Sequence, residues 1–250
     1  GDVGSQITLS SGALLTLNAN GTFDYDPNGQ FEHVPLNATG TDSFTYEVNG
    51  VEATVTVTIT GIDDAPTLDT NTGSFLSEGG VDRIVAAELD TNDVDTTDAN
   101  IVYTLDSLAA NGSLWIDTDL SGTINDAEAA LGVSDTFTQA DIANGLIAYA
   151  HDGSETTTDR FEFSVTDGTT PASGLAFDFS IKPVEDPTVA QDDVFAIVET
   201  GSITGGNVLV DNGNGADADP DTALAVTSVN GSAGDVGSQI TLSSGALLTL

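Results

Sequence analysis

The sequence lacks cysteine and methionine altogether, and it carries only three basic side chains, Arg83, Arg160 and Lys182. Against them stand 40 acidic residues, which gives a formal net charge of −37. So few cations form no phosphate-binding surface, and nucleic acid is therefore excluded as a partner. A chain of 250 residues can bury a core without disulfides, so the missing cysteine does not argue for the cytosol.

Other absences argue against further classes of function. No apolar run is long enough to span a bilayer, so we expect no membrane insertion, and no signal peptide opens the sequence, which begins in mid-pattern. Two histidines, His33 and His151, are too few for most catalytic sites, and no glycine-rich phosphate loop is present. Carboxylate pairs suit a glycosidase, but the lone Trp115 is expected in a core rather than in a sugar cleft. We expect no enzyme.

The acid charge itself needs an explanation. Self-repulsion on this scale opposes compaction. Yet 39% of the residues are apolar and β-branched residues are frequent, so the chain does not have the composition of a disordered protein. We therefore expect divalent cations to offset the charge; the alternative is an acidic surface that keeps the protein soluble in salty water.

A long repeat organises the chain. Residues 1–17 read GDVGSQITLSSGALLTL, and residues 234–250 repeat these letters without a change. Gly1 recurs as Gly234, which is a period of 233 residues. Such identity predicts a near-uniform tandem array, so neighbouring copies of the same repeat are expected partners.

Each period contains two related modules. TDSFTYEVNG (41–50) resembles TDRFEFSVTDG (158–168), and an alternating strand and an acidic, proline-marked junction follow each. One module is expected over 65–187. The other is split: 188–250 is its first part and 1–64 the last part of the preceding one. The two parts could pair within the chain, pair between neighbours, or stay unpaired.

Period-2 alternation predicts strands at 43–48, 53–60, 161–165 and 175–181. Short helical turns are expected only at 124–131 and 137–144. These features favour an all-β fold of tandem immunoglobulin-like sandwiches with Greek-key connections.

The motif DTDLSGTINDAE (117–128) fits the twelve-residue EF-hand calcium loop, with Gly122 at the sharp turn. Its candidate ligands, at positions 1, 3, 5, 7, 9 and 12, are Asp117, Asp119, Ser121, Thr123, Asn125 and Glu128. A strand precedes the loop and a short helical turn, DAEAAL, follows. The expected Kd for Ca²⁺ is about 10⁻⁴–10⁻³ M, as in extracellular modules. The alternative is an acidic turn without metal.

Two family resemblances cover nearly the whole chain. VDTTDANIVYTL and FTQADIANGLIAYAHDGSETTTDRFEFSVTDG resemble the chondroitin-sulfate-proteoglycan-type repeat of the cadherin-like class. DNGNGADADPDTALAVTSVNG, GTFDYDPNGQF and GIDDAP resemble VCBS-type or cadherin-like repeats of bacterial adhesins. The resemblance implies a type I-secreted giant adhesin of the RTX type on the bacterial cell surface, in which the calcium loop is an insertion.

The resemblance also implies calcium between modules. The residues matched to the first junction are Asp63, Asp64, Asp93, Asp95, Asp167 and Glu199. Those matched to the second are Glu78, Asp152, Glu155, Glu185, Asp186, Asp219 and Asp221. The alternative is that these acids are turn residues and solvated charge.

We expect these modules to act as a calcium-stiffened extender of an extracellular adhesin that mediates attachment to surfaces and in biofilms. The alternatives are a self-assembling matrix filament and modules that bind polysaccharide directly through calcium. The identity of the repeats favours the extender, because modules that bind ligands usually differ from copy to copy.

Overall fold

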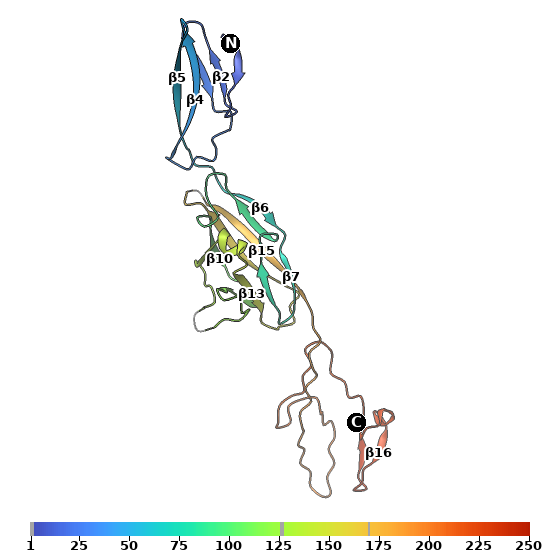
Figure 1. Ribbon diagram of the computed structural model, residues 1–250. Coiled ribbons are helices and arrows are strands. Elements are labelled where there is room, and N and C mark those ends of the chain that lie inside the picture. Colours follow the sequence, from blue (N-terminus) through green and yellow to red (C-terminus); the bar gives the residue numbers. More distant parts are fainter. Residues whose placement is uncertain (1–2, 126–127, 170) are drawn as a thin grey trace. The chain divides into compact units, whose positions relative to one another are not determined.

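The computed structural model describes residues 3–125, 128–169 and 171–250. The chain divides into two compact units, Gly1–Pro183 and Val184–Leu250, and each is described by itself. Regular structure is almost entirely strand, which confirms the predicted all-β fold (Figure 1). No helix in the described part of the chain is long and apolar enough to cross a membrane.

The first five strands occupy residues 6–60. They are β1 (Gln6–Thr8), β2 (Leu14–Leu17), β3 (Phe23–Asp26), β4 (Thr39–Val48) and β5 (Val51–Thr60). The first three form an antiparallel sheet in the order β1-β2-β3, and β4 pairs with β5 as a separate hairpin. Asn49 and Gly50 both have positive φ in the turn of this hairpin, as a two-residue turn requires.

The next strands form the larger module. They are β6 (Thr67–Asn71), β7 (Ser74–Ser77), β8 (Val81–Ile84), β9 (Leu89–Asn92), β10 (Val102–Ser107), β11 (Gly112–Ile116), β12 (Thr136–Thr138), β13 (Ile147–His151), β14 (Thr158–Thr166) and β15 (Ala172–Lys182). A five-stranded sheet has the order β12-β10-β14-β15-β7, and three-stranded and two-stranded sheets have the orders β11-β13-β8 and β6-β9. All pairs are antiparallel except β15 with β7.

The core of this module is aromatic. Phe161, Phe163 and Phe177 are fully buried, and the rings of Phe161 and Phe177 stack with centroids 5.5 Å apart. Alternation puts these rings on one face of β14 and β15 while residues between them stay exposed. Trp115 is 1% exposed, as expected, but it lies outside this core cluster, whereas its neighbour Leu114 belongs to it.

One of the two expected helical turns forms. The helix α1 (Gln139–Ala143) begins at Thr138, whose hydroxyl accepts from the Asp141 N–H while the Asp141 carboxylate accepts from Thr138. The turn expected at 124–131 includes residues 126–127, which lie outside the described residues. The part that follows is not helical, because Ala130 forms a β-bridge with Trp115 instead.

The second unit has little regular structure. Its elements are the short η1 (Ala233–Asp235) and the strands β16 (Gln239–Thr241) and β17 (Leu247–Thr249). The β16–β17 hairpin has the register of β1–β2 at every pair: Gln239 faces Thr249 as Gln6 faces Thr16. The repeated sequence therefore forms the same local structure in both units.

Candidate metal centres

The loop that begins at Asp117 starts where β11 ends. The Asp117 N–H donates to the Leu146 carbonyl at 2.7 Å, which anchors the loop to the sheet, and the Asp117 side chain is fully buried. Leu120 and Gly122 then adopt positive φ, so the chain turns sharply where the twelve-residue pattern requires it. At Gly122 the left-handed backbone explains the glycine.

Three carboxylates converge in this loop. Oxygens of Asp117, Asp119 and Glu128 all lie within 4.8 Å of one another. One Glu128 oxygen, Oε1, accepts from the Thr118 N–H at 2.7 Å, whereas Oε2 is buried and has no hydrogen-bond partner. A buried carboxylate oxygen without a donor is costly unless a cation binds it. The donor set therefore fits a hard cation such as Ca²⁺.

The other predicted ligands order the same loop. The Ser121 hydroxyl donates to the Thr123 carbonyl at 3.0 Å, and the Asn125 amide donates to Asp119 Oδ2 at 3.0 Å. The Gly122 N–H donates to Asp117 Oδ2 at 2.7 Å. The structure thus brings together all six residues that the sequence predicted for this site. Residues 126–127 lie outside the described residues.

Sequence reasoning missed a basic partner of this loop. Arg83, in β8, forms an ion pair with Asp117 and also donates to the Gly145 carbonyl at 3.0 Å. Burial by itself raises the pKa of Asp117, but the Gly122 N–H and the guanidinium outweigh it, so that the pKa is lowered. Arg83 is one of only three basic residues in a strongly acidic chain, and this rarity could have pointed to it as a partner of a buried acid.

A second acidic group consists of the predicted ligands of the first junction that belong to the first unit, Asp63, Asp64, Asp93, Asp95 and Asp167. Asp93 Oδ1 accepts from the N–H groups of Asp95 and Thr96, both at 2.9 Å. Asp167 Oδ1 accepts from Thr169, whose hydroxyl also donates to Asp63. Thr169 therefore links the linker acid Asp63 to the turn at Asp167.

The remaining oxygens of this group are buried. Asp64, Asp93, Asp95 and Asp167 each have an Oδ2 that is shielded from solvent and has no hydrogen-bond partner. Burial raises the pKa of Asp95, and the neighbouring Asp93 raises it further. Each of these oxygens therefore lacks the donor that a buried carboxylate requires. Among the described residues, the acid groups whose oxygens lie within 4.8 Å of one another do not include these four, so a shared cation site stays a prediction.

The second unit contains a matching turn. Asp219 Oδ1 accepts from the N–H groups of Asp221 and Thr222, as Asp93 does from Asp95 and Thr96. The Asp186 N–H donates to Asp221, and the Thr188 hydroxyl donates to Asp219. Hydrogen bonds from Thr188 and Thr222 lower the pKa of Asp219. Three of the predicted residues are therefore brought together within this unit.

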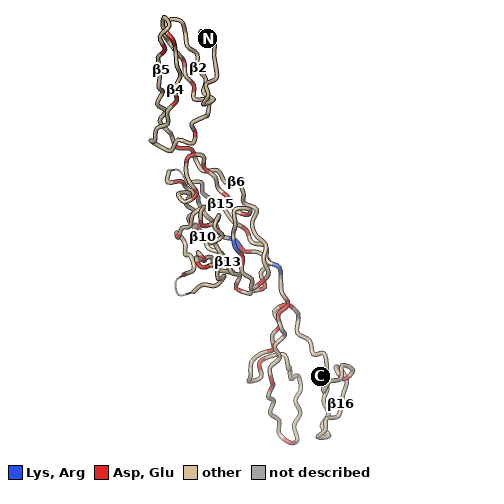
Figure 2. The backbone as a smooth tube through the Cα atoms, viewed as in Figure 1, with Lys and Arg blue, Asp and Glu red and all other residues tan. Residues whose placement is uncertain are grey.

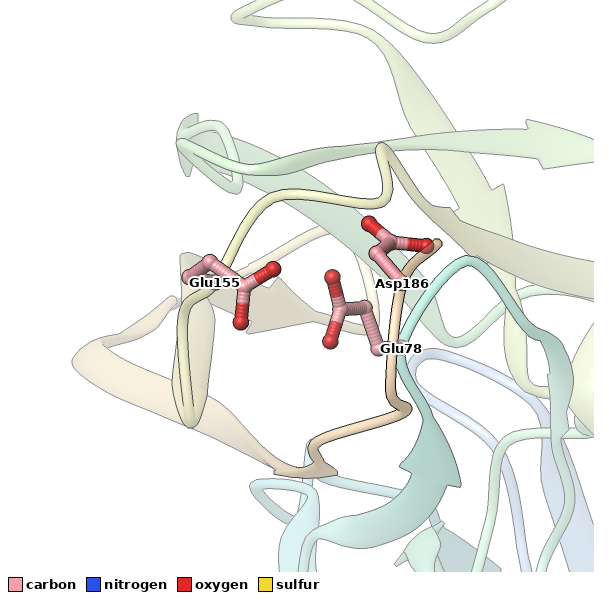
Figure 3. A group of neighbouring side chains, drawn as sticks. All are labelled: Glu78, Glu155 and Asp186. Atoms are coloured by element: carbon pink, nitrogen blue, oxygen red, sulfur yellow. The ribbon is translucent and has the colours of Figure 1, made fainter. Parts of the chain in front are cut away.

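Glu78 and Glu155, both predicted ligands of the second junction, lie close together. Both belong to the first unit, and their carboxylate oxygens lie within 4.8 Å of each other (Figure 3). Asp186, which Figure 3 also labels, belongs to the second unit, and its role as a ligand stays a prediction. Asp152 is exposed, and a hydrogen bond from Ser154 lowers its pKa. Glu185 and Glu199 are exposed residues of the second unit, and their roles also stay predictions.

Acidic residues far outnumber basic ones along the chain, as the acidic groups described above require. Figure 2 shows acidic residues along the whole chain and basic residues at few places. His151, by contrast, is a structural residue: its Nδ1 accepts from the N–H groups of Gly79 and Gly153, and its Nε2 bonds the Thr156 hydroxyl at 2.8 Å.

Known families cover the first unit in two pieces. Residues 66–182 match the cadherin-like family model. Residues 1–60 match the model of a bacterial Ig domain. Both descriptions agree with the sandwich fold predicted from the sequence. The VCBS-type resemblance of the split module stays a prediction.

Several relatives are extracellular matrix proteins by name. The extracellular matrix organizing protein FRAS1 of Mus musculus is 31% identical over 178 residues, which is 63% of this chain and 4% of that protein. Extracellular matrix protein 3 of Lytechinus variegatus is 33% identical over 132 residues, 51% of this chain and 4% of that protein. Chondroitin sulfate proteoglycan 4 of Homo sapiens is 31% identical over 146 residues, 55% of this chain and 6% of that protein. The chain thus spans a small fraction of each relative.

Proposed function

We propose that this chain is a structural, non-catalytic extracellular repeat whose cadherin-like module is stabilised by Ca²⁺. The observation that carries the proposal is the loop 117–128, in which three carboxylates converge and Glu128 Oε2 is buried without a donor. The names of the relatives support an extracellular, matrix-type setting.

The physical effect follows from mass action. A ligand that binds only the folded state stabilises it by RT ln(1 + [L]/Kd). With a Kd of about 10⁻⁴–10⁻³ M, 10 mM Ca²⁺ adds about 1.4–2.7 kcal/mol. The same ion neutralises carboxylates that otherwise repel one another in a chain of net charge −37.

The second acidic group supports a stiffening role. Asp63 and Asp64 lie in the connection that precedes the cadherin-like module, and Asp93, Asp95 and Asp167 belong to the module itself. A cation bound by both sets restricts the connection. We propose that the array projects other parts of an adhesin or matrix protein from a cell surface; polysaccharide binding through Ca²⁺ is the second candidate.

The test is thermal unfolding of the full chain in 10 mM Ca²⁺ and in chelator, followed by Trp115 fluorescence. Because Trp115 is the only tryptophan and lies beside the loop, it reports on this module. We expect Ca²⁺ to raise the Tm of the wild type and to have a smaller effect on Glu128→Gln. Asp178→Asn, an exposed acid on β15, is the matched control and should respond as the wild type does. Equal melting curves with and without Ca²⁺ would refute the proposal.

A further inference from the structure

The interior of the cadherin-like module contains a polar cluster that is separate from the acidic groups described above. Its members Thr91 in β9, Tyr103 in β10 and Gln139 at the start of α1 are at most 1% exposed. Asp90, which is half-buried beside Thr91, completes the cluster. A hydroxyl nucleophile, a carboxamide and a carboxyl group are therefore in contact at a site that is shielded from water.

The carboxamide oxygen of Gln139 accepts two hydrogen bonds. The Thr91 N–H donates to Oε1 at 3.0 Å, and the Tyr103 hydroxyl lies 2.6 Å from the same oxygen. Two fixed donors at one carbonyl oxygen polarise the carbonyl and stabilise the negative charge that develops when a nucleophile adds to its carbon. In acyl-transfer sites the N–H of the nucleophilic residue itself often serves as one of these donors. This arrangement activates Gln139 Cδ toward the Thr91 hydroxyl.

The Tyr103 hydroxyl joins the two reacting groups. Its oxygen lies 2.7 Å from Thr91 Oγ1 and 2.6 Å from Gln139 Oε1. It can therefore take a proton from Thr91 while it gives its own proton to Oε1. Burial raises the pKa of Tyr103, so the hydroxyl stays protonated and remains a donor.

The carboxamide nitrogen has a carboxyl partner. Gln139 Nε2 donates to Asp90 Oδ1 at 2.7 Å. Burial raises the pKa of Asp90, and the neighbouring Asp69 raises it further. Asp90 therefore holds a proton more readily than a solvated aspartate, and it stands where a general acid for the departing nitrogen is required.

Regular structure holds the cluster in place. The Gln139 N–H donates to the Ile101 carbonyl at 3.0 Å, and the capping box of α1 fixes the turn that carries Gln139. Thr91 lies in β9, which pairs with β6. Groups on such elements keep their relative positions. The same burial excludes the water that would hydrolyse an ester.

We propose that Thr91 and Gln139 join autocatalytically in an ester bond and release ammonia. The Thr91 Oγ1–H bond breaks and an Oγ1–Cδ bond forms, while Tyr103 takes the Thr91 proton and passes its own to Oε1. The Cδ–Nε2 bond then breaks as Asp90 protonates Nε2 and recovers the proton from Oε1. The products are one ester and one ammonia, and no oxidant or reductant is consumed.

The bond ties distant parts of the module together. The two residues are 48 positions apart, and the segment between them contains β10, β11 and the loop 117–128. A cross-link across such a segment stabilises the folded state mainly because it restricts the unfolded chain. The sequence has no cysteine, so a disulfide cannot supply this restriction. The ester gives an extracellular repeat a covalent brace that does not require calcium.

The test is the intact mass of the purified full chain. We expect a mass about 17 Da below that of the sequence, because one ammonia leaves. Ring closure at Asn–Gly sequences also releases ammonia, so the position must be established. After proteolysis between residues 91 and 139, the peptide that contains β9 should remain joined to the peptide that contains α1. Mild alkali, which hydrolyses esters, should separate them.

Matched variants assign the roles. Thr91→Val removes the nucleophile and should abolish the joined peptides, whereas Thr91→Ser keeps a hydroxyl and should retain them. Tyr103→Phe keeps the ring and should reduce the joined peptides at least tenfold. Thr104→Val is the control, because this half-buried threonine lies on the face of β10 opposite Tyr103, and it should behave as the wild type does. Trp115 fluorescence reports whether each variant remains folded.

Each contrary outcome is decisive. A wild-type chain of full mass whose peptides separate would overturn the proposal, and the cluster would then serve only to hold α1 against β9. A mass deficit that persists in Thr91→Val would assign the lost ammonia to another position. None of these measurements depends on calcium, so the ester and the calcium site stand or fall separately.

Discussion

The replacement of Arg83 by methionine tests the electrostatics of the loop. Arg83 pairs with Asp117, whose side chain is fully shielded, while the Arg83 side chain is 29% exposed. Methionine keeps most of the aliphatic volume and removes the charge. Asp117 then remains buried with hydrogen bonds from Ser121 and Gly122 but without a basic partner.

The magnitude follows from this environment. Removal of one partner of a fully buried ion pair costs about 3–5 kcal/mol. The partial exposure of Arg83 and the two remaining N–H donors reduce this, and we expect about 2 kcal/mol in chelator. For a module of this size that corresponds to a Tm about 8 °C lower. With Ca²⁺ bound, the ion supplies positive charge at the same carboxylate, so the loss should fall to about half.

The assay is thermal unfolding followed by Trp115 fluorescence, in chelator and in 10 mM Ca²⁺. Arg160→Met is the matched control, because Arg160 pairs with Glu162 on the surface, where both side chains are at least half exposed. It should change stability by less than about 1 kcal/mol in either buffer. An Arg83→Met variant that loses the same stability in both buffers would show that Ca²⁺ does not act at Asp117.

Three further predictions concern the rest of the first unit. Phe163→Ala removes a fully buried ring and should cost about 3–5 kcal/mol in chemical unfolding; a loss below 1 kcal/mol would contradict the assigned core. Asp159→Ala removes the carboxylate that accepts from the N–H groups of Ala110 and Asn111 and from the Tyr149 hydroxyl. This substitution should cost about 3 kcal/mol in the same assay. Burial and the neighbouring Asp42 raise the pKa of Tyr25 to about 12 from 10.0. The stability that the protonated Tyr25 contributes is therefore complete below pH 10 and lost as the pH rises to 12. Circular dichroism should show a smaller alkaline loss in Tyr25→Phe than in the wild type, because Tyr103 and Tyr149, whose pKa values burial also raises, remain in both.

Much of the first unit followed from local patterns. Alternation predicted β4, β5, β14 and β15, because a strand with one buried face repeats every two residues. The helix α1 also formed within the expected range 137–144. In the range 124–131 the described residues contain a turn hydrogen bond from the Glu128 N–H to the Asn125 carbonyl at 2.9 Å but no helix, and Ala130 pairs with Trp115 across the module instead.

In the candidate sites, too, local spacing predicted some contacts and tertiary packing decided others. Spacing alone predicted that Asp117, Asp119 and Glu128 converge, because twelve residues around a glycine turn wrap their oxygens about one point. It did not predict Arg83, which lies 34 residues away in sequence and reaches the loop only through the pairing of β8 with β13.

The sequence by itself determined that this protein is an acidic, all-β, repeating chain, because composition, alternation and identical segments are properties of the letters. Tertiary structure alone decided which carboxylate oxygens are buried without donors and which hairpin is left uncovered. Both depend on what packs against a residue from distant parts of the chain. Phe163 and Tyr46 occupy equivalent positions in their strands, yet only Phe163 is fully buried, because β10 and β7 flank its hairpin, whereas no described strand pairs with the outer edges of β4 and β5.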